Sequence, residues 1–299
     1  MIERNNAVFI DTNVISHLTK SGVSAENLNR LLSNRRLKAA LGFFTLYEIS
    51  VNLKTSDPKH AEHCYGFISE LNPLFILPHW KLRELEIAQL RSNSEFNAFI
   101  LDFTDQDGIG QAITYFSKGI FPKNVQIRIQ EIEHDIKLQK DSWIPTVHQE
   151  AMRKRYKKNE FLKRRDDFFR SSLECTTHRQ AIIDAIKQTT RDSCIITDSE
   201  ALLLVKNIDE YPILRTTINN FLYFDFYTNQ DKAPSIEKFK DSTQILDASY
   251  CSHFLSHEKG LLKNHLREVN PSIKPLLFYI NKKVGEVEFD IIDILEEVS

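Results

Sequence analysis

The sequence predicts an α/β protein whose central sheet is mainly parallel. The run at residues 7–10, Ala-Val-Phe-Ile, is apolar without alternation, as expected for a strand that is buried on both faces. The pattern then changes to helical spacing over residues 14–18. Apolar runs at 39–44 and 275–280 are expected to form further strands, the second of them after a helical segment at 259–269.

The first apolar run ends in Asp11, Thr12 and Asn13. In open α/β sheets, ligands bind at the carboxyl ends of the strands, so Asp11 is a candidate site residue. The alternative is that one of these three residues only caps the next helix, because all three types are good caps and turn formers.

Residues 9–13, Phe-Ile-Asp-Thr-Asn, resemble the first motif of the PIN-domain family of metal-dependent nucleases. In that family the first strand ends in a hydrophobic residue followed by Asp-Thr-Asn or Asp-Ser-Asn. The resemblance implies a PIN-like three-layer α/β/α sandwich with a mainly parallel central sheet. It also implies three or four acidic residues, drawn from distant segments, that hold Mg²⁺ or Mn²⁺.

The second acid of the family lies early in a helix after the second strand, in a hydrophobic-Thr/Ser-x-x-x-Glu pattern. Residues 44–49, Phe-Thr-Leu-Tyr-Glu-Ile, resemble this pattern closely and make Glu48 the second candidate. The alternative is an ordinary glutamate on a helix surface, which is the commonest position of Glu.

The segment 241–258 resembles the closing pattern of the family, in which a helix that begins with Asp leads into a strand that ends in Thr-x-Asp. Ser256 follows Asp241 by 15 residues and Glu258 follows it by 17, which fits a helix, a tight loop and a strand. Ser256 stands where Thr is usual, and Glu258 where Asp is usual. The serine keeps the hydroxyl, and the glutamate keeps the charge on a longer side chain.

Asp247 is the alternative to Asp241 on the same predicted helix. At about 100° per residue, Ile245 and Ala248 lie roughly on the side of Asp241, whereas Asp247 lies about 240° away. We therefore assign Asp241 to the site and Asp247 to a polar face or a supporting role, and the reverse assignment stays open.

A rival set of acids lies at Asp184, Asp198 and Glu200. Residues 181–184 have helical character, and residues 194–197, Cys-Ile-Ile-Thr, resemble a strand that leads into Asp198. Only 13 residues separate Asp184 from Thr197, which is slightly short for a helix, a loop and a strand. The later pair is therefore preferred, although 197–200 is the better Thr-x-acid text. If the rival set were correct, the last hundred or so residues would form an accessory domain.

If the four preferred acids converge, their mutual repulsion requires a hard cation, and Mg²⁺ or Mn²⁺ prefers oxygen ligands. Asp11 and Asp241 are then the expected direct ligands, with Glu48 and Glu258 on a second ion or on water. Thr12, Asn13 and Ser256 are expected to orient these carboxylates or to contact a phosphate.

The length of 299 residues exceeds what a PIN-like domain needs, so we expect an insertion. The resemblance covers roughly residues 5–60 and 205–285. We therefore assign 1–60 and 205–299 to a PIN-like nuclease domain and 61–204 to a helical insertion packed on it. The low counts of 8 Gly and 9 Pro argue against long structureless loops in this insertion.

A basic segment lies within the expected insertion. Eight of its thirteen residues are basic: Arg153, Lys154, Arg155, Lys157, Lys158, Lys163, Arg164 and Arg165. Such a segment attracts phosphates, and the interleaved Tyr156 or Phe161 could stack on an unpaired base. The alternative is a solvated basic helix face with its aromatic residues packed inward.

Composition and the remaining motifs narrow the class. The chain is 41% hydrophobic with a formal net charge of −2, no run approaches the length of a membrane span, and its first residues do not resemble a signal peptide. We expect a cytoplasmic protein without a membrane partner. The four scattered cysteines predict buried thiols instead of a zinc site or a disulfide framework, and no histidine pair has zinc-hydrolase spacing. His253 and His257 flank the closing strand and are expected to be surface or packing residues.

Three functions are compared. The first is a PIN-type endoribonuclease that depends on Mg²⁺ or Mn²⁺ and acts as a toxin or in defence. Its substrate would be RNA, with DNA not excluded, and its partners an antitoxin or a second copy of the chain. The second is a non-catalytic RNA-binding or scaffold protein with the same fold. The third is another phosphate-handling enzyme, such as a structure-specific DNA nuclease or a phosphatase. A dehalogenase-type phosphatase would need Asp-x-Asp where this chain has Asp11-Thr12-Asn13.

Overall fold

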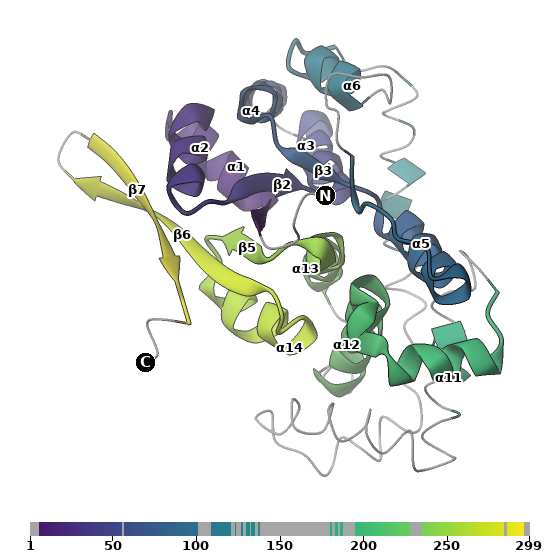
Figure 1. Cartoon of the computed structure of the whole chain (residues 1–299). Coiled ribbons are helices and arrows are strands. Elements are labelled where there is room, and N and C mark those ends of the chain that lie inside the picture. Colours follow the sequence, from purple (N-terminus) through teal and green to yellow (C-terminus); the bar gives the residue numbers. More distant parts are fainter. Residues whose placement is uncertain are drawn as a thin grey trace.

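The computed structural model describes residues 6–55, 57–100, 109–120, 195–227, 235–283 and 286–295, together with a few single positions between 123 and 187. Within these residues, seven strands form one sheet in the order β4-β3-β2-β1-β5-β6-β7 (Figure 1). The strands are β1 (Ala7–Ile10), β2 (Lys38–Leu41), β3 (Leu74–Ile76), β4 (Phe99–Ile100), β5 (His253–Ser256), β6 (Lys274–Lys283) and β7 (Glu286–Asp293).

The sheet is mainly parallel, as the sequence predicts. The four central pairings, from β3 across to β6, are parallel, and only the outermost pairings with β4 and β7 are antiparallel. From β1 the chain builds the sheet towards β3 on one side, and β5 and β6 are added on the other side. The order therefore changes direction between β1 and β5, and this is the point of an open α/β sheet where ligands bind.

Helices connect the strands and surround the sheet (Figure 1). They are α1 (Thr12–Lys20), α2 (Ala25–Asn34), α3 (Phe43–Thr55), α4 (Pro58–Leu71), α5 (His79–Ser92), α6 (Ile109–Phe116), α11 (Asp198–Lys206), α12 (Pro212–Tyr227), α13 (Ile236–Asp247) and α14 (Arg267–Val269). Three short turns complete the set: η3 (Ile208–Glu210), η4 (Ala248–Tyr250) and the π-helical η5 (Leu261–Leu266). Among the described helices, none combines the length and the apolar character that a membrane crossing requires.

Strand β1 is buried on both faces, which explains its unbroken apolar sequence. All four of its residues are fully buried. Ala7 and Phe9 belong to one hydrophobic cluster with residues of α5, α12 and α13, whereas Val8 and Ile10 belong to a second cluster with residues of α1, α2 and α4. Helices thus pack on both faces, an arrangement compatible with a three-layer sandwich.

The predicted strand at 39–44 is wrong at its carboxyl end. Strand β2 stops at Leu41, and α3 already begins at Phe43. The Asp247 carboxylate accepts a hydrogen bond of 3.1 Å from the Phe44 backbone N–H, so it satisfies one of the free donors at this helix start. A side chain at Gly42 would overlap Asp247, so the turn requires a glycine.

The predicted helical insertion is wrong for its first forty or so residues. The boundary at residue 61 cuts α4, and both β3 and β4 belong to the central sheet. Most of 101–194 lies outside the described residues. The helical segment expected at 259–269 corresponds to η5 and α14, and the final strand expected at 275–280 corresponds to the longer β6.

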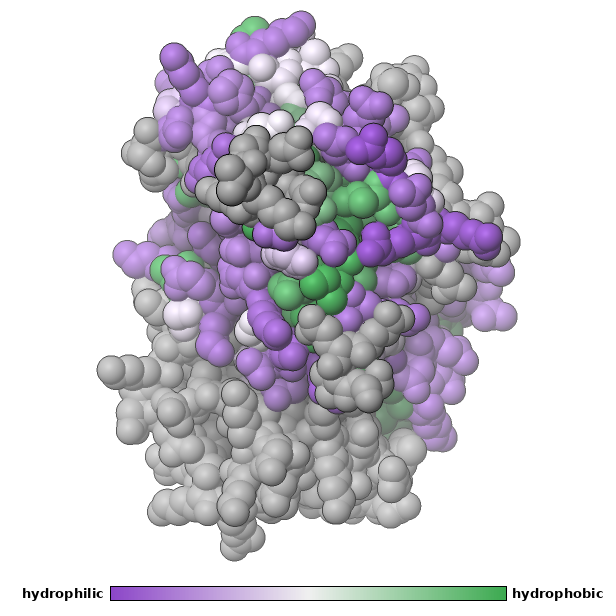
Figure 2. All heavy atoms as spheres, turned by 90° about the vertical axis from the view of Figure 1, so that its left-hand side faces the viewer, coloured by the Kyte–Doolittle hydropathy of each residue, from purple (hydrophilic) through white to green (hydrophobic). Residues whose placement is uncertain are grey.

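Strand β7 was not predicted, and it forms the antiparallel edge beside β6. Its sequence at residues 286–291 alternates acidic and apolar residues, which is the period-two pattern of a strand with one solvated face. Figure 2 shows the molecule from the side of this edge, where hydrophilic atoms surround a smaller hydrophobic area.

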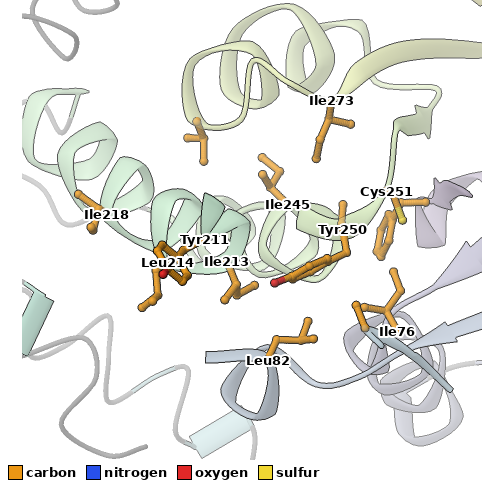
Figure 3. Packing of buried hydrophobic residues seen from close by; sticks show 14 of the residues in the cluster. Ile76, Leu82, Tyr211, Ile213, Leu214, Ile218, Ile245, Tyr250, Cys251 and Ile273 are labelled. Carbon is orange, nitrogen blue, oxygen red and sulfur yellow. The ribbon is translucent and has the colours of Figure 1, made fainter. Parts of the chain in front are cut away.

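Helix α12 is anchored through the core on one face of the sheet (Figure 3). Ile213, Leu214 and Ile218 of this helix share the cluster with Leu82 of α5. The fully buried Glu86 of α5 accepts hydrogen bonds from the backbone N–H groups of Ile213 (2.8 Å) and Leu214 (2.9 Å). It also accepts one from the Tyr250 hydroxyl at 2.5 Å. A buried carboxylate thus caps the start of α12 from another helix.

Candidate functional site

The candidate site lies where the carboxyl ends of β1 and β5 meet. Asp11 follows β1, and Ser256 is the last residue of β5. The Asp11 backbone N–H donates to the Leu255 carbonyl at 3.0 Å, which extends the pairing of the two strands to this point. Side chains separated by about 245 positions are therefore brought together by the register of two neighbouring strands.

Asp11 is 1% exposed and is held by two hydrogen bonds. Its Oδ2 accepts from the Ser256 hydroxyl at 2.5 Å, and its Oδ1 accepts from the Asn13 backbone N–H at 3.1 Å. The second bond caps α1, so Asp11 does fill the capping role that was the alternative. Capping does not account for the bond to Ser256, which orients the carboxylate at the sheet edge.

Glu48 points from α3 towards the same edge. Its Oε2 accepts from the Thr12 hydroxyl at 2.7 Å and from the Gln244 side-chain amide at 2.5 Å. Gln244 was not predicted as a site residue. It lies three residues after Asp241 in α13, hence on roughly the same helix face, and that spacing is the sequence signal that could have identified it.

Glu258 lies just beyond β5 and faces α1. Its Oε1 accepts from the Asn13 side-chain amide at 2.7 Å, and its backbone N–H donates to the Ser256 hydroxyl at 3.0 Å. Ser256 therefore joins Asp11 and Glu258. Thr12, Asn13 and Ser256, the three residues predicted to orient carboxylates, each bond to one of the predicted acids.

Asp241 lies on α13 three residues before Gln244, the residue that donates to Glu48. Burial is the largest cause that raises the pKa of Asp241 to about 7, and the negative charges of Glu258, Asp11 and Glu48 contribute to this rise in that order. The Lys238 ammonium opposes this shift. The Asp241 carboxyl is thus close enough to all three acids to respond to their charges.

The pKa values of the other buried acids also move upwards. Burial raises the pKa of Asp11 to about 6 against the bonds from Ser256 and Asn13, and Glu258 adds repulsion. Burial also raises the pKa of Glu48. None of the four acids forms an ion pair with a lysine or arginine of the described residues, so their repulsion is only partly offset.

Asp247 does not lie on a polar face, contrary to one of its two predicted roles. It is 1% exposed, caps the start of α3, and lies 3.3 Å from Nδ1 of His79. The bond from Phe44 fixes α3 four residues before Glu48, and His79 is the first residue of α5. The structure thus gives Asp247 a supporting position and leaves Asp241 with the cluster.

The rival acids lie elsewhere and have other partners. The predicted strand at 194–197 is absent from the described residues 195–197, and Thr197 caps α11 in a reciprocal capping box with Glu200. Glu200 also pairs with Arg91 at 2.6 Å, and Asp198 pairs with Lys187. Asp184 accepts from Gln180. These acids are not brought to Asp11, so they do not form the alternative site.

The basic segment at 153–165, with Tyr156 and Phe161, lies outside the described residues, as do Cys175 and Cys194. Cys64 and Cys251 are buried free thiols, as predicted. His253 is half-buried beside Ser252, and the His257 ring lies 4.3 Å from that of His17.

The donor chemistry of the cluster suits a hard divalent cation, because every candidate ligand atom is a carboxylate oxygen. In this arrangement, however, no group of three or more His, Cys, Asp or Glu among the described residues forms a ready metal site. Both oxygens of Asp11 accept a hydrogen bond, whereas one oxygen of Glu48 and one of Glu258 do so. The second oxygens of Glu48 and Glu258 accept no hydrogen bond from the described residues, so both could face an ion.

Fold and site together define an α/β protein with a cluster of four acidic side chains at the carboxyl edge of a mainly parallel sheet. Comparisons with protein-family models, with curated proteins and with solved structures find no match for this chain. The chemistry of the acidic cluster is therefore the basis for its function.

Proposed function

We propose that this chain is a metal-dependent nuclease of PIN type that hydrolyses phosphodiester bonds in RNA. The observation that carries the proposal is the convergence of Asp11, Glu48, Asp241 and Glu258 at the point where the strand order changes direction. Concentrating four carboxylates destabilises a fold unless the site binds a cation. A protein that keeps such a cluster despite its cost in stability is expected to use it in a function.

Asp11 and Asp241 would hold Mg²⁺ or Mn²⁺ directly, and Glu48 and Glu258 would contribute through their second oxygens. The ion would supply Lewis acidity, activated water and charge stabilisation at the phosphate. The chain's own residues set the geometry: Ser256 orients Asp11, Thr12 and Gln244 orient Glu48, and Asn13 orients Glu258. RNA as substrate follows from the family resemblance of the motif at residues 9–13.

The hydrogen bonds within the cluster favour a second candidate function. Because hydroxyl and amide donors already engage three of the acids, the chain could use the same fold to bind RNA or a partner without cleaving it. A toxin or defence role with an antitoxin partner extends the first candidate, and a DNA nuclease differs from it only in substrate.

Cleavage of labelled single-stranded RNA and DNA in Mn²⁺ and in chelator tests the proposal. Asp11→Asn and Asp241→Asn should each lower the rate by more than about 100-fold, because even the outer partners of metal ligands contribute 10- to 100-fold. Asp198→Asn is the matched control and should cleave at the rate of the unmodified protein. Cleavage that persists in chelator, or in both site variants, would refute the nuclease assignment. Binding without cleavage would favour the second candidate.

A further inference from the structure

Two aromatic side chains are exposed at the edge of the sheet that also carries the acidic cluster. Phe43 is 37% exposed at the start of α3, and Trp80 is 42% exposed at the start of α5. Helix α3 follows β2 and helix α5 follows β3, so both side chains lie at the carboxyl edge of the sheet, on the side of β1 away from β5. This is the edge that carries Asp11.

The two rings are held in a fixed arrangement. Their centroids lie 6.1 Å apart with an interplanar angle of 79°, and the His79 ring packs edge-on to Trp80 at 5.2 Å. His79 contacts Asp247, and Asp247 also accepts from the Phe44 backbone. One buried carboxylate therefore ties both helix starts, and with them both rings, to the end of α13.

The same helices connect the rings to the acids. Phe43 precedes Glu48 by five residues in α3, which is about 7.5 Å along the helix axis. Asp247 follows Gln244 by three residues in α13, and Gln244 donates to Glu48. An RNA strand that places a phosphate at the acids would therefore lie along the same edge of the sheet as the aromatic pair.

Single exposed aromatic residues are common on protein surfaces and need no function. Here, two exposed rings are fixed by a buried carboxylate at the edge where an α/β sheet binds ligands. Helix α13 also carries two lysines. The charge of Lys238 lowers the pKa of Asp241 and that of Lys240 lowers the pKa of Glu48, so positive charge that can attract phosphates lies near the acids.

We propose that Trp80 and Phe43 form a stacking platform for an unpaired nucleobase of single-stranded RNA next to the acidic cluster. The inference rests on the proposed function and deepens it, because it assigns the substrate class of the same site. A base in a duplex has both faces covered by its neighbours, so the platform selects single strands. Stacking tolerates any sequence, because every base has a π face.

Binding in chelator tests the platform separately from cleavage. The chain has two tryptophans, so Trp143→Phe leaves Trp80 as the only indole reporter. A short single-stranded RNA of mixed sequence should quench the fluorescence of Trp80, and the duplex of the same sequence should not.

Affinity is measured by the anisotropy of labelled RNA. Trp80→Ala should weaken binding roughly 5- to 150-fold, and Trp80→Phe should restore most of the affinity. The matched control is Tyr115→Ala, which removes an aromatic residue that is 51% exposed on α6 and should leave affinity unchanged.

The platform is refuted if Trp80→Ala binds single-stranded RNA as tightly as the unmodified protein, or if duplex RNA quenches Trp80 equally. Equal losses for Trp80→Ala and Tyr115→Ala would also refute it. Stacking without cleavage would refute only the proposed nuclease, whereas cleavage that is insensitive to Trp80 would refute only the platform. A single-stranded DNA arm shows whether the base stack alone, without the 2′-hydroxyl, is sufficient.

Discussion

Ionisation of Asp11 and Asp241 opposes folding. The pKa values of these carboxyls rise from 3.8 to about 6 and about 7 in the folded chain, so each binds its proton more tightly when folded than when unfolded. The resulting stabilisation is fully present below about pH 4. This stabilisation is lost as the pH rises through 6 and then 7. At neutral pH the ionised carboxylates therefore lower the free energy of unfolding.

Asp241→Asn should therefore stabilise the metal-free protein at high pH. The amide keeps the shape of the side chain and removes the charge, so the free energy of unfolding at pH 8 in chelator should increase by about 1–3 kcal/mol. At pH 4 the two proteins should differ little. Urea unfolding at both pH values measures this. Asp209→Asn, at a side chain that is 86% exposed, is the control and should change little at either pH. A variant less stable than the unmodified protein at pH 8 would contradict the expectation.

The apolar run of β1 indicated Asp11, and the resemblance of 241–258 to the closing pattern of the PIN family indicated Ser256 and Glu258. The structure joins these three residues through hydrogen bonds, and their role in binding a metal stays a prediction. Sequence reasoning failed for Gln244, because an amide in a helix has no chemical signature of its own. Only its place on the helix face shared with Asp241 distinguishes it from other glutamines.

At the scale of elements, two helix starts, those of α3 and α12, are anchored by carboxylates from other elements. Asp247 of α13 caps α3, and Glu86 of α5 caps α12. Such caps join distant segments, so no local pattern predicts them. The same holds for the end of β2, where the apolar sequence continues into α3 and only the turn at Gly42 and its contact with Asp247 separate strand from helix.

Glu86→Ala should destabilise the protein by about 2–4 kcal/mol, because it leaves two backbone N–H groups and the Tyr250 hydroxyl without their buried acceptor. Denaturant unfolding measures the effect. Glu84→Ala removes a glutamate from the same helix whose partner is the exposed Lys81, and it should cost less than about 0.5 kcal/mol. Similar losses of stability in the two variants would show that the buried cap contributes no more than an exposed ion pair.

At the scale of the molecule, the predicted class and the mainly parallel sheet are confirmed. The antiparallel edges were not foreseen. Strand β4 has only two residues, which is too short for a hydrophobic period, whereas β7 was missed although its acidic and apolar residues alternate as in a strand. The boundary at residue 61 was wrong because the short β3 was not recognised as part of the sheet.

Divalent ions should stabilise the whole fold, since a bound ion would join β1, α3, α13 and the segment after β5. Mn²⁺ at about 100 times its dissociation constant should add about 2.7 kcal/mol, and thus raise the melting temperature by roughly 5–10 °C at pH 7.5. Thermal unfolding with and without Mn²⁺ measures the shift. The double variant Asp11→Asn with Asp241→Asn should show no shift, and an equal shift in both proteins would place the ion elsewhere.

The central position of β5 also has a consequence for how the protein is made. The Ser256 partner of Asp11 is synthesised 245 residues after it, and β1 cannot pair with β5 before then. For the proposed nuclease, an unfinished chain on the ribosome would lack a complete site. Its activity would begin only after β5 has been translated and paired with β1.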